Sequence, residues 1–111
     1  MVQKQYRLSF LPLFYDDLLE AVKYIKLNLK NDQAAEELLN LTEIAIRERL
    51  NSPESFEKFQ SIKERKYPYY RIYVKNFIVF YVVIPDENDS DIAIMEVRRF
   101  LYNRRDLEKV L

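Results

Sequence analysis

Arginine and tyrosine side chains gather in two stretches of the second half of the chain. In the first stretch, Arg71 stands between Tyr69 and Tyr73 in an alternating run, which places all three on one face of a predicted strand. A guanidinium among phenols can bind a phosphate through two hydrogen bonds or stack on a base. It can equally be a solvent-side arginine that packs on aromatic neighbours. Lys75 adds a further cation to this stretch.

The second stretch lies close to the C-terminus and contains Arg98, Arg99, Tyr102, Arg104 and Arg105. Strand alternation predicts that Arg98 and Arg99 point to opposite faces, which lets one of them point inward and need a partner. Arginines that flank a tyrosine can bind RNA phosphates and stabilise the transition state of strand cleavage, with the phenol in proton transfer. The same edge can instead dock an acidic protein. Both interpretations stay open at this point.

Residue types that are missing exclude several kinds of chemistry. The chain has no Cys, no His and no Gly. Thiolate nucleophiles, Ser-His-Asp triads and metal sites built on Cys or His are therefore excluded. Phosphate-binding loops and dinucleotide fingerprints need glycine and are also excluded. No pair of carboxylates is spaced to converge, so we expect neither a metal nor another cofactor.

The charge of the chain is balanced overall but uneven along its length. The formal net charge is zero, with 18 basic and 18 acidic residues. Two basic clusters, over residues 63–75 and 98–111, suggest a local anionic partner, although a solvated basic face explains them equally well. No apolar run approaches the length of a membrane span, and the opening MVQKQYRLSF lacks the apolar core of a secretory signal. We therefore expect a cytoplasmic protein without a membrane partner.

The first half of the chain predicts one strand and two helices. Residues 3–10 alternate polar and apolar side chains, as a strand does. Residues 13–29 and 33–50 have helical periodicity. The apolar stripe of the first helix is predicted to contain Tyr15, Leu18, Val22, Ile25 and Leu29, and that of the second to contain Ala35, Leu38, Leu39, Thr42, Ala45 and Ile46. Asn31-Asp32 supplies a break with an N-cap, and residues 53–66 are predicted to be a loop.

The second half predicts three strands, over residues 67–74, 77–84 and 92–101, followed by a short helix or tail. Residues 77–84 are apolar on both faces, which is typical of a central strand. Lys75-Asn76 is a two-residue hairpin link, in which Asn76 is expected to take the positive φ. The predicted fold is α+β in the order β-α-α-β-β-β. A helical hairpin packs on a twisted, mainly antiparallel four-stranded sheet, in one domain over residues 1–111.

With this order of elements, the run YRIYVKNFIVFYVV and the closing VRRFLYNRRDLEKVL resemble the RelE/ParE superfamily of bacterial toxins from type II toxin–antitoxin modules. The resemblance covers essentially the whole chain. Its most specific motif has an arginine, a His or Tyr, and an Arg-Arg-Asp at fixed spacing. In this chain the motif reads Val97, Arg99, Phe100, Tyr102, Arg104, Arg105, Asp106.

The resemblance implies a growth inhibitor that a cognate antitoxin neutralises, with a role in plasmid stabilisation. RelE-like members cut mRNA on the ribosome without metal, whereas ParE-like members inhibit DNA gyrase. By position, the family's sheet arginine falls on Arg71, its fourth-strand arginine on Arg99, and its His or Tyr on Tyr102. These three would be catalytic only in a ribonuclease. Contacts to nucleic acid or to a target protein would come from Tyr73, Lys75, Arg104 and Arg105.

Two departures favour the gyrase inhibitor slightly. Ile78 stands where RelE-like ribonucleases commonly have an arginine, and those ribonucleases are usually strongly basic whereas this chain is neutral. A ribosome-dependent ribonuclease stays an alternative, which leaves open whether the chain is an enzyme. A third alternative is a degenerate member that only binds its antitoxin.

Overall fold

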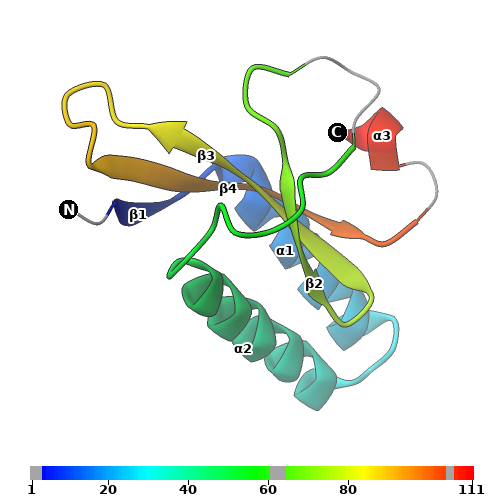
Figure 1. The fold of residues 1–111 in the computed structure, drawn as a ribbon. Coiled ribbons are helices and arrows are strands. Elements are labelled where there is room, and N and C mark those ends of the chain that lie inside the picture. The colour runs from blue at the N-terminus through cyan, green and yellow to red at the C-terminus, as the bar shows by residue number, and fades with distance from the viewer. Residues whose placement is uncertain (1–3, 61–64, 105–106) are drawn as a thin grey trace.

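A computed structural model describes residues 4–60, 65–104 and 107–111 (Figure 1). The elements follow in the expected order β-α-α-β-β-β, with a short helix at the end. They are β1 (Gln5–Phe10), α1 (Pro12–Leu27), α2 (Asp32–Arg49), β2 (Tyr70–Val74), β3 (Phe77–Pro85), β4 (Ile92–Tyr102) and α3 (Leu107–Val110). Within the described residues, no helix is long and apolar enough to cross a membrane.

The four strands form one mixed sheet in the order β1-β4-β3-β2. β1 runs parallel to β4, whereas the β3–β4 and β2–β3 pairs are antiparallel. The prediction of a mainly antiparallel sheet is therefore confirmed. The central position of β3 is confirmed as well, because residues 78–82 are buried between two neighbouring strands.

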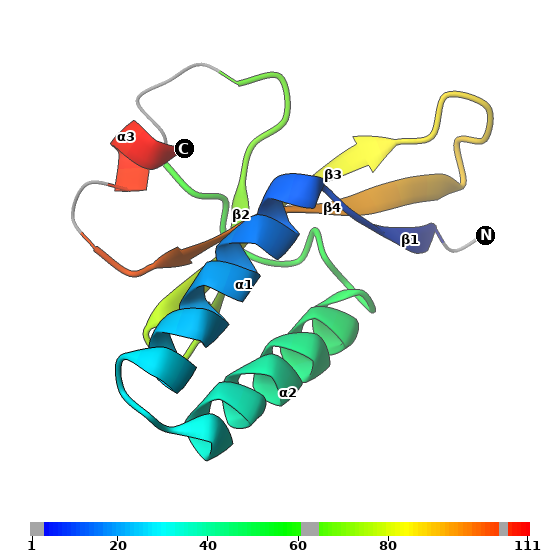
Figure 2. The ribbon, with the colours of Figure 1, turned by 180° about the vertical axis from the view of Figure 1, so that it is seen from behind.

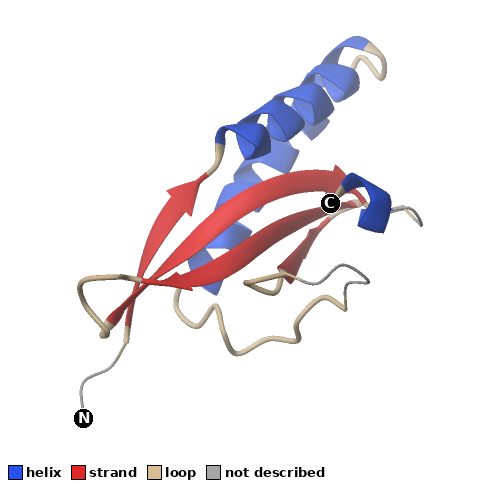
Figure 3. Cartoon of the chain, turned by 90° about the horizontal axis from the view of Figure 1, so that it is seen from above, coloured by secondary structure: helices blue, strands red, loops and turns tan. Residues whose placement is uncertain are grey.

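Helices α1 and α2 lie side by side on one face of the sheet (Figures 2 and 3). Pro12 opens α1, where its missing N–H costs no helical hydrogen bond. The predicted stripe of α1 is wrong at its two ends, because Tyr15 and Leu29 are 54% and 57% exposed. Phe14 and Ala21 are buried in addition, and the middle of the predicted stripe packs on the core as expected. Leu29 is exposed because it lies beyond the end of the helix.

Helix α2 begins as predicted. The Asn31 side chain caps it by accepting a hydrogen bond from the Ala34 N–H at 3.0 Å. The predicted stripe is buried or half-buried except for Leu39, which is 38% exposed. The one buried polar residue of this stripe, Thr42, satisfies its hydroxyl by donating to the Leu38 carbonyl at 2.7 Å.

The opposite face of the sheet carries a second, smaller apolar cluster. It is built on Tyr69, Phe80 and Leu107, with Phe59 packed against it. The segment before β2 and helix α3 therefore cover part of the face that α1 and α2 leave free. Both faces of β3 are buried for this reason, which matches its apolar sequence.

Two local details differ from the predictions. The second strand begins at Tyr70 rather than Tyr67, because Pro68 has no N–H to donate to a sheet. Lys58, in the predicted loop, bridges to Tyr70 from outside the sheet. In the hairpin turn, the residue with positive φ is Lys75 (54°), not Asn76.

Candidate functional site

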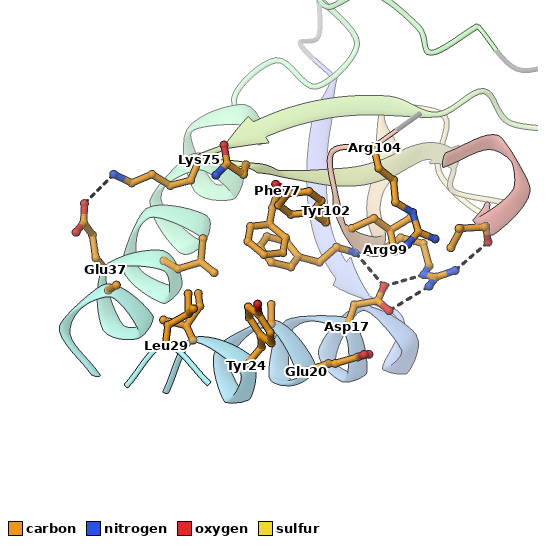
Figure 4. A pocket seen from close by; sticks show the side chains of 18 residues that line it. Asp17, Glu20, Tyr24, Leu29, Glu37, Lys75, Phe77, Arg99, Tyr102 and Arg104 are labelled. Atoms are coloured by element: carbon orange, nitrogen blue, oxygen red, sulfur yellow. Dashed lines mark hydrogen bonds and ion pairs between the residues drawn. The ribbon is translucent and has the colours of Figure 1, made fainter. Parts of the chain in front are cut away.

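A groove of about 890 Å³ opens where helix α1 and the first turns of α2 meet the β2–β3 turn and the end of β4 (Figure 4). Four predicted site residues line it, namely Lys75, Arg99, Tyr102 and Arg104. The two helices and the connection between them contribute a mixture of apolar and acidic side chains, namely Asp17, Glu20, Ala21, Tyr24, Ile25, Leu29, Ala34, Glu37 and Leu38.

Tyr102 is displayed by an aromatic stack on the helix side of the sheet. Phe77 stacks on Phe100 with ring centroids 4.8 Å apart, and the Tyr102 ring meets Phe77 edge-on at 5.6 Å. Phe77 and Tyr102 are also register partners across β3 and β4, so their side chains share one face. The packed rings hold Tyr102 in place while leaving its side chain 55% exposed to solvent.

Lys75 is held at the rim of the groove by the hairpin turn. Its ammonium lies 3.0 Å from a Glu37 carboxylate oxygen, and both side chains are more than half exposed. Such a pair contributes little to stability and exchanges readily with solvent or a new partner. Lys75 can therefore be recruited by an incoming carboxylate without a large cost.

Arg99 is engaged inside the protein. It donates from Nε to Asp17 Oδ2 at 2.7 Å and from Nη2 to Asp17 Oδ1 at 3.1 Å. A third bond runs from Nη1 to the Val110 carbonyl at 3.2 Å. The hydrogen bonds and charge of Asp17 raise the pKa of Arg99 against the opposing effect of burial. A guanidinium whose Nε and Nη2 groups both donate to one carboxylate has few N–H groups left to bind a phosphate.

Asp17 holds Arg99 because of how β1 ends. Strand β1 stops at Phe10, so β4 loses its neighbour beyond Val97. Helix α1 takes that place, and Asp17 Oδ2 accepts the Phe100 N–H at 3.0 Å as a strand carbonyl would. The Asp17 carboxylate thus accepts hydrogen bonds both from the unpaired backbone of β4 at Phe100 and from the Arg99 side chain.

The expected alternation of Arg98 and Arg99 does not hold. The β3–β4 register shifts between Phe80 and Tyr81, and two residues of β4 instead of one separate the inward-facing Val97 and Phe100. Arg98 turns to Glu96 on its own strand, with Nε 2.8 Å from Oε2. A bulge therefore releases Arg99 from regular alternation and lets it reach α1 and α3.

Arg71 lies on the other face of the sheet from Tyr102. Its neighbours Tyr70 and Ile72 belong to the core under the helices, so Arg71 and Tyr73 face away from α1 and α2. The Arg71 guanidinium sits 5.2 Å from the Phe59 ring centroid and 5.9 Å from that of Tyr73. This agrees with the predicted arginine among aromatic side chains.

The predicted residues are consequently divided. Lys75, Tyr102 and Arg104 lie in the groove, and Arg99 lies at its edge in an ion pair with Asp17. Arg71 and Tyr73 lie on the face of the sheet that points away from α1 and α2. Arg105 falls outside the described residues. Among the residues that the structure describes, no cluster of His, Cys, Asp and Glu is suited to a metal ion.

Asp17, Phe77 and Tyr24 are groove residues that the sequence reasoning missed. An inward arginine on the fourth strand needs a partner, which was a signal for an acidic residue elsewhere. Nothing in the local sequence distinguishes Asp17 from Asp16 or Glu20 for that role. That Phe77 packs against Tyr102 follows only from the register of β3 and β4.

A comparison with family models adds an independent finding. The model described as ParE toxin of type II toxin–antitoxin system, parDE, matches residues 8–106. Among curated proteins, none matches the chain.

Proposed function

The chain belongs to the ParE toxin family of type II toxin–antitoxin systems, and from this premise we propose that it arrests bacterial growth by binding DNA gyrase. The observation that carries the proposal is the separation of the side chains that RNA cleavage would need. Arg71 and Tyr102 lie on opposite faces of the sheet, and Arg99 is bound by Asp17. A proton-transfer residue and its phosphate-binding partners must converge on one substrate atom.

The composition of the groove supports a protein partner. Tyr24, Leu29 and Tyr102 are each more than half exposed, beside the cations of Lys75 and Arg104. Aromatic and aliphatic anchors with arginine at the rim are typical of protein interfaces. The neutral chain also lacks the bulk positive charge that draws a protein to RNA.

We propose further that a cognate antitoxin neutralises the toxin by covering this groove. An amphipathic segment would bury the exposed apolar side chains and set acidic residues against Lys75 and Arg104. Gyrase and antitoxin would then compete for one surface, and neutralisation would follow from exclusion.

One observation favours the ribosome-dependent ribonuclease as a second candidate. On the face away from the helices, Arg71 lies over Phe59 and the Arg98 guanidinium lies 6.0 Å from the Tyr69 ring centroid. The Tyr73 ring beside Arg71 is 59% exposed, and a guanidinium next to an exposed ring can bind a nucleic acid backbone and its bases. In that case the RNA would have to reach Tyr102 around the edge of the sheet.

Toxicity of three variants separates these functions. The gyrase proposal predicts that Tyr102→Phe stays toxic, because no proton is transferred, whereas Arg104→Glu loses toxicity. Arg7→Glu is the matched control, because Arg7 is an exposed arginine on β1, outside the groove. Each variant is induced in bacteria and colony counts are followed, with folding checked by circular dichroism.

The alternatives give different results. A folded Tyr102→Phe chain without toxicity would support the ribonuclease and contradict the gyrase proposal. If Arg104→Glu and Arg7→Glu lose toxicity equally, the loss comes from the change in net charge and not from the groove. A wild-type chain that leaves growth unchanged would indicate a degenerate member.

A further inference from the structure

The backbone groups at the two edges of the sheet differ in how far other parts of the chain cover them. The β2 edge is covered over its first half, because Phe59 N–H donates to the Tyr69 carbonyl at 2.7 Å and Arg49 Nη1 donates to the Arg71 carbonyl at 2.9 Å. The outermost strand on the other side is β1 (Figure 1). Unprotected strand edges are templates for pairing with another chain.

The hydrogen bonds between β1 and β4 show which backbone groups of β1 point away from the sheet. Gln5 and Leu11 both donate their N–H toward β4, to the carbonyls of Asp91 and Val97. Alternate residues of a strand direct their backbone groups to the same side, so Arg7 and Ser9 also face β4. The N–H and C=O groups of the three intervening residues, Tyr6, Leu8 and Phe10, are therefore directed away from the sheet.

A groove of about 520 Å³ lies beside this edge on the helix side, with apolar side chains from β1 and α1 and both apolar and polar ones from α2. Leu8 and Phe10 of β1 line it, and Phe14 closes part of its wall. Two exposed apolar side chains stand in its lining, Tyr15 at 54% and Leu39 at 38%. An added strand would cover this apolar surface while pairing with the free backbone groups.

We propose that a second copy of this chain covers the edge, with β1 antiparallel to β1 of the other copy and the twofold axis through Leu8. In this register, Leu8 pairs with Leu8 of the partner subunit and Tyr6 pairs with Phe10 of the partner subunit. All three outward residues then exchange backbone hydrogen bonds. The inference does not depend on the proposed function.

The side chains favour this register over its neighbours. A twofold axis through Arg7 would set two arginines directly opposite each other, which is destabilising. An axis through Ser9 would bring Tyr6 opposite Pro12, which has no N–H to donate. With the axis through Leu8, Arg7 faces the partner's Ser9, so no like charges oppose. The chain's zero net charge adds no long-range repulsion between copies.

Amide hydrogen exchange with light-scattering mass measurement tests this proposal on the full chain made by cell-free synthesis. As concentration rises, the mass should rise toward that of a dimer. The amides of Tyr6, Leu8 and Phe10 should change from fast to slow exchange, while those of Arg7 and Ser9 stay slow throughout. Only pairing at the outer edge of β1 produces this alternating pattern.

A matched pair of substitutions on α2 tests the groove. Leu39→Glu should prevent dimerisation, whereas Ile44→Glu should not, because Ile44 is 52% exposed but lies outside the groove. A monomeric wild-type chain with fast amides at Tyr6, Leu8 and Phe10 at every concentration would overturn the proposal. So would a dimer protected elsewhere, or protection of these amides only when an antitoxin is added.

Discussion

Replacing Asp17 by alanine tests the most consequential side-chain contact of the candidate site. The substitution removes both hydrogen bonds that Arg99 makes to the carboxylate, and it leaves the Phe100 N–H without its acceptor. Arg99 would keep only its bond to the Val110 carbonyl. A charge that is mostly removed from water would then lack its counter-ion.

The expected cost follows from the burial of the pair. The Arg99 and Asp17 side chains are 17% and 10% exposed. Breaking a buried pair by removing one partner costs about 3–5 kcal/mol, and we expect the lower end, about 3 kcal/mol, because the arginine keeps some contact with water. For a domain of this size that corresponds to a fall in Tm of roughly 12 °C.

Thermal and urea unfolding of the purified variants measure this cost. Asp16→Ala is the matched control, because it removes an exposed carboxylate one residue earlier in the same helix and should change stability by no more than about 0.5 kcal/mol. Arg99→Ala should add little to Asp17→Ala in the double variant, since the two residues act as a unit.

A small effect would refute the reasoning. If Asp17→Ala costs less than about 1 kcal/mol, the pair is no stronger than a surface ion pair. Arg99 would then be free to bind a phosphate, and the argument that Asp17 withholds Arg99 from RNA would fall.

Three further predictions concern the scaffold. Lys30→Gly should stabilise the chain by about 1 kcal/mol because Lys30 has φ 50°, whereas Lys23→Gly inside α1 should cost about 1 kcal/mol. Equal urea midpoints for these two variants would contradict this. Tyr81→Phe should cost about 1–3 kcal/mol in urea unfolding, because the buried phenol donates to a backbone carbonyl at 2.7 Å and accepts from a guanidinium at 3.0 Å; no change would show these bonds to be dispensable. Burial, with a hydrogen bond to Glu54 and its charge, raises the pKa of Tyr6 from 10.0 to about 12. The stabilisation from that raised pKa is intact below pH 10 and is lost as the pH rises toward 12, so Tyr6→Phe should lose less stability over this range in pH-dependent unfolding; parallel curves would exclude the contribution.

The order and type of the elements were predictable because hydrophobic period and turn residues determine them locally. Asn31 was identifiable as an N-cap from its type and place, and residues 77–84 as a central strand from their apolar faces. The stripe of α1 was predicted correctly in its middle and wrongly at its ends, because Tyr15 and Leu29 are apolar enough to fit the pattern while remaining exposed.

The arrangement of the site was less predictable because it depends on long-range geometry. Asp17 and Arg99 are 82 positions apart, and they meet only because β1 ends where α1 begins. The bulge before Arg99 leaves no mark in the sequence, so alternation gave the wrong faces. Strand register decides that Arg71 and Tyr102 lie on opposite faces, and composition alone does not reveal it.

Pulse-labelling after induction of the chain without antitoxin tests the proposed target most directly. DNA and protein synthesis are followed separately in the same culture, and mRNA is examined for new ends in the ribosomal A site. A gyrase inhibitor predicts that DNA synthesis fails and cells filament while translation continues. Translation that stops within the first samples, with new mRNA ends in the A site, would contradict the proposal and make Tyr102 and the arginines around it candidates for a catalytic site.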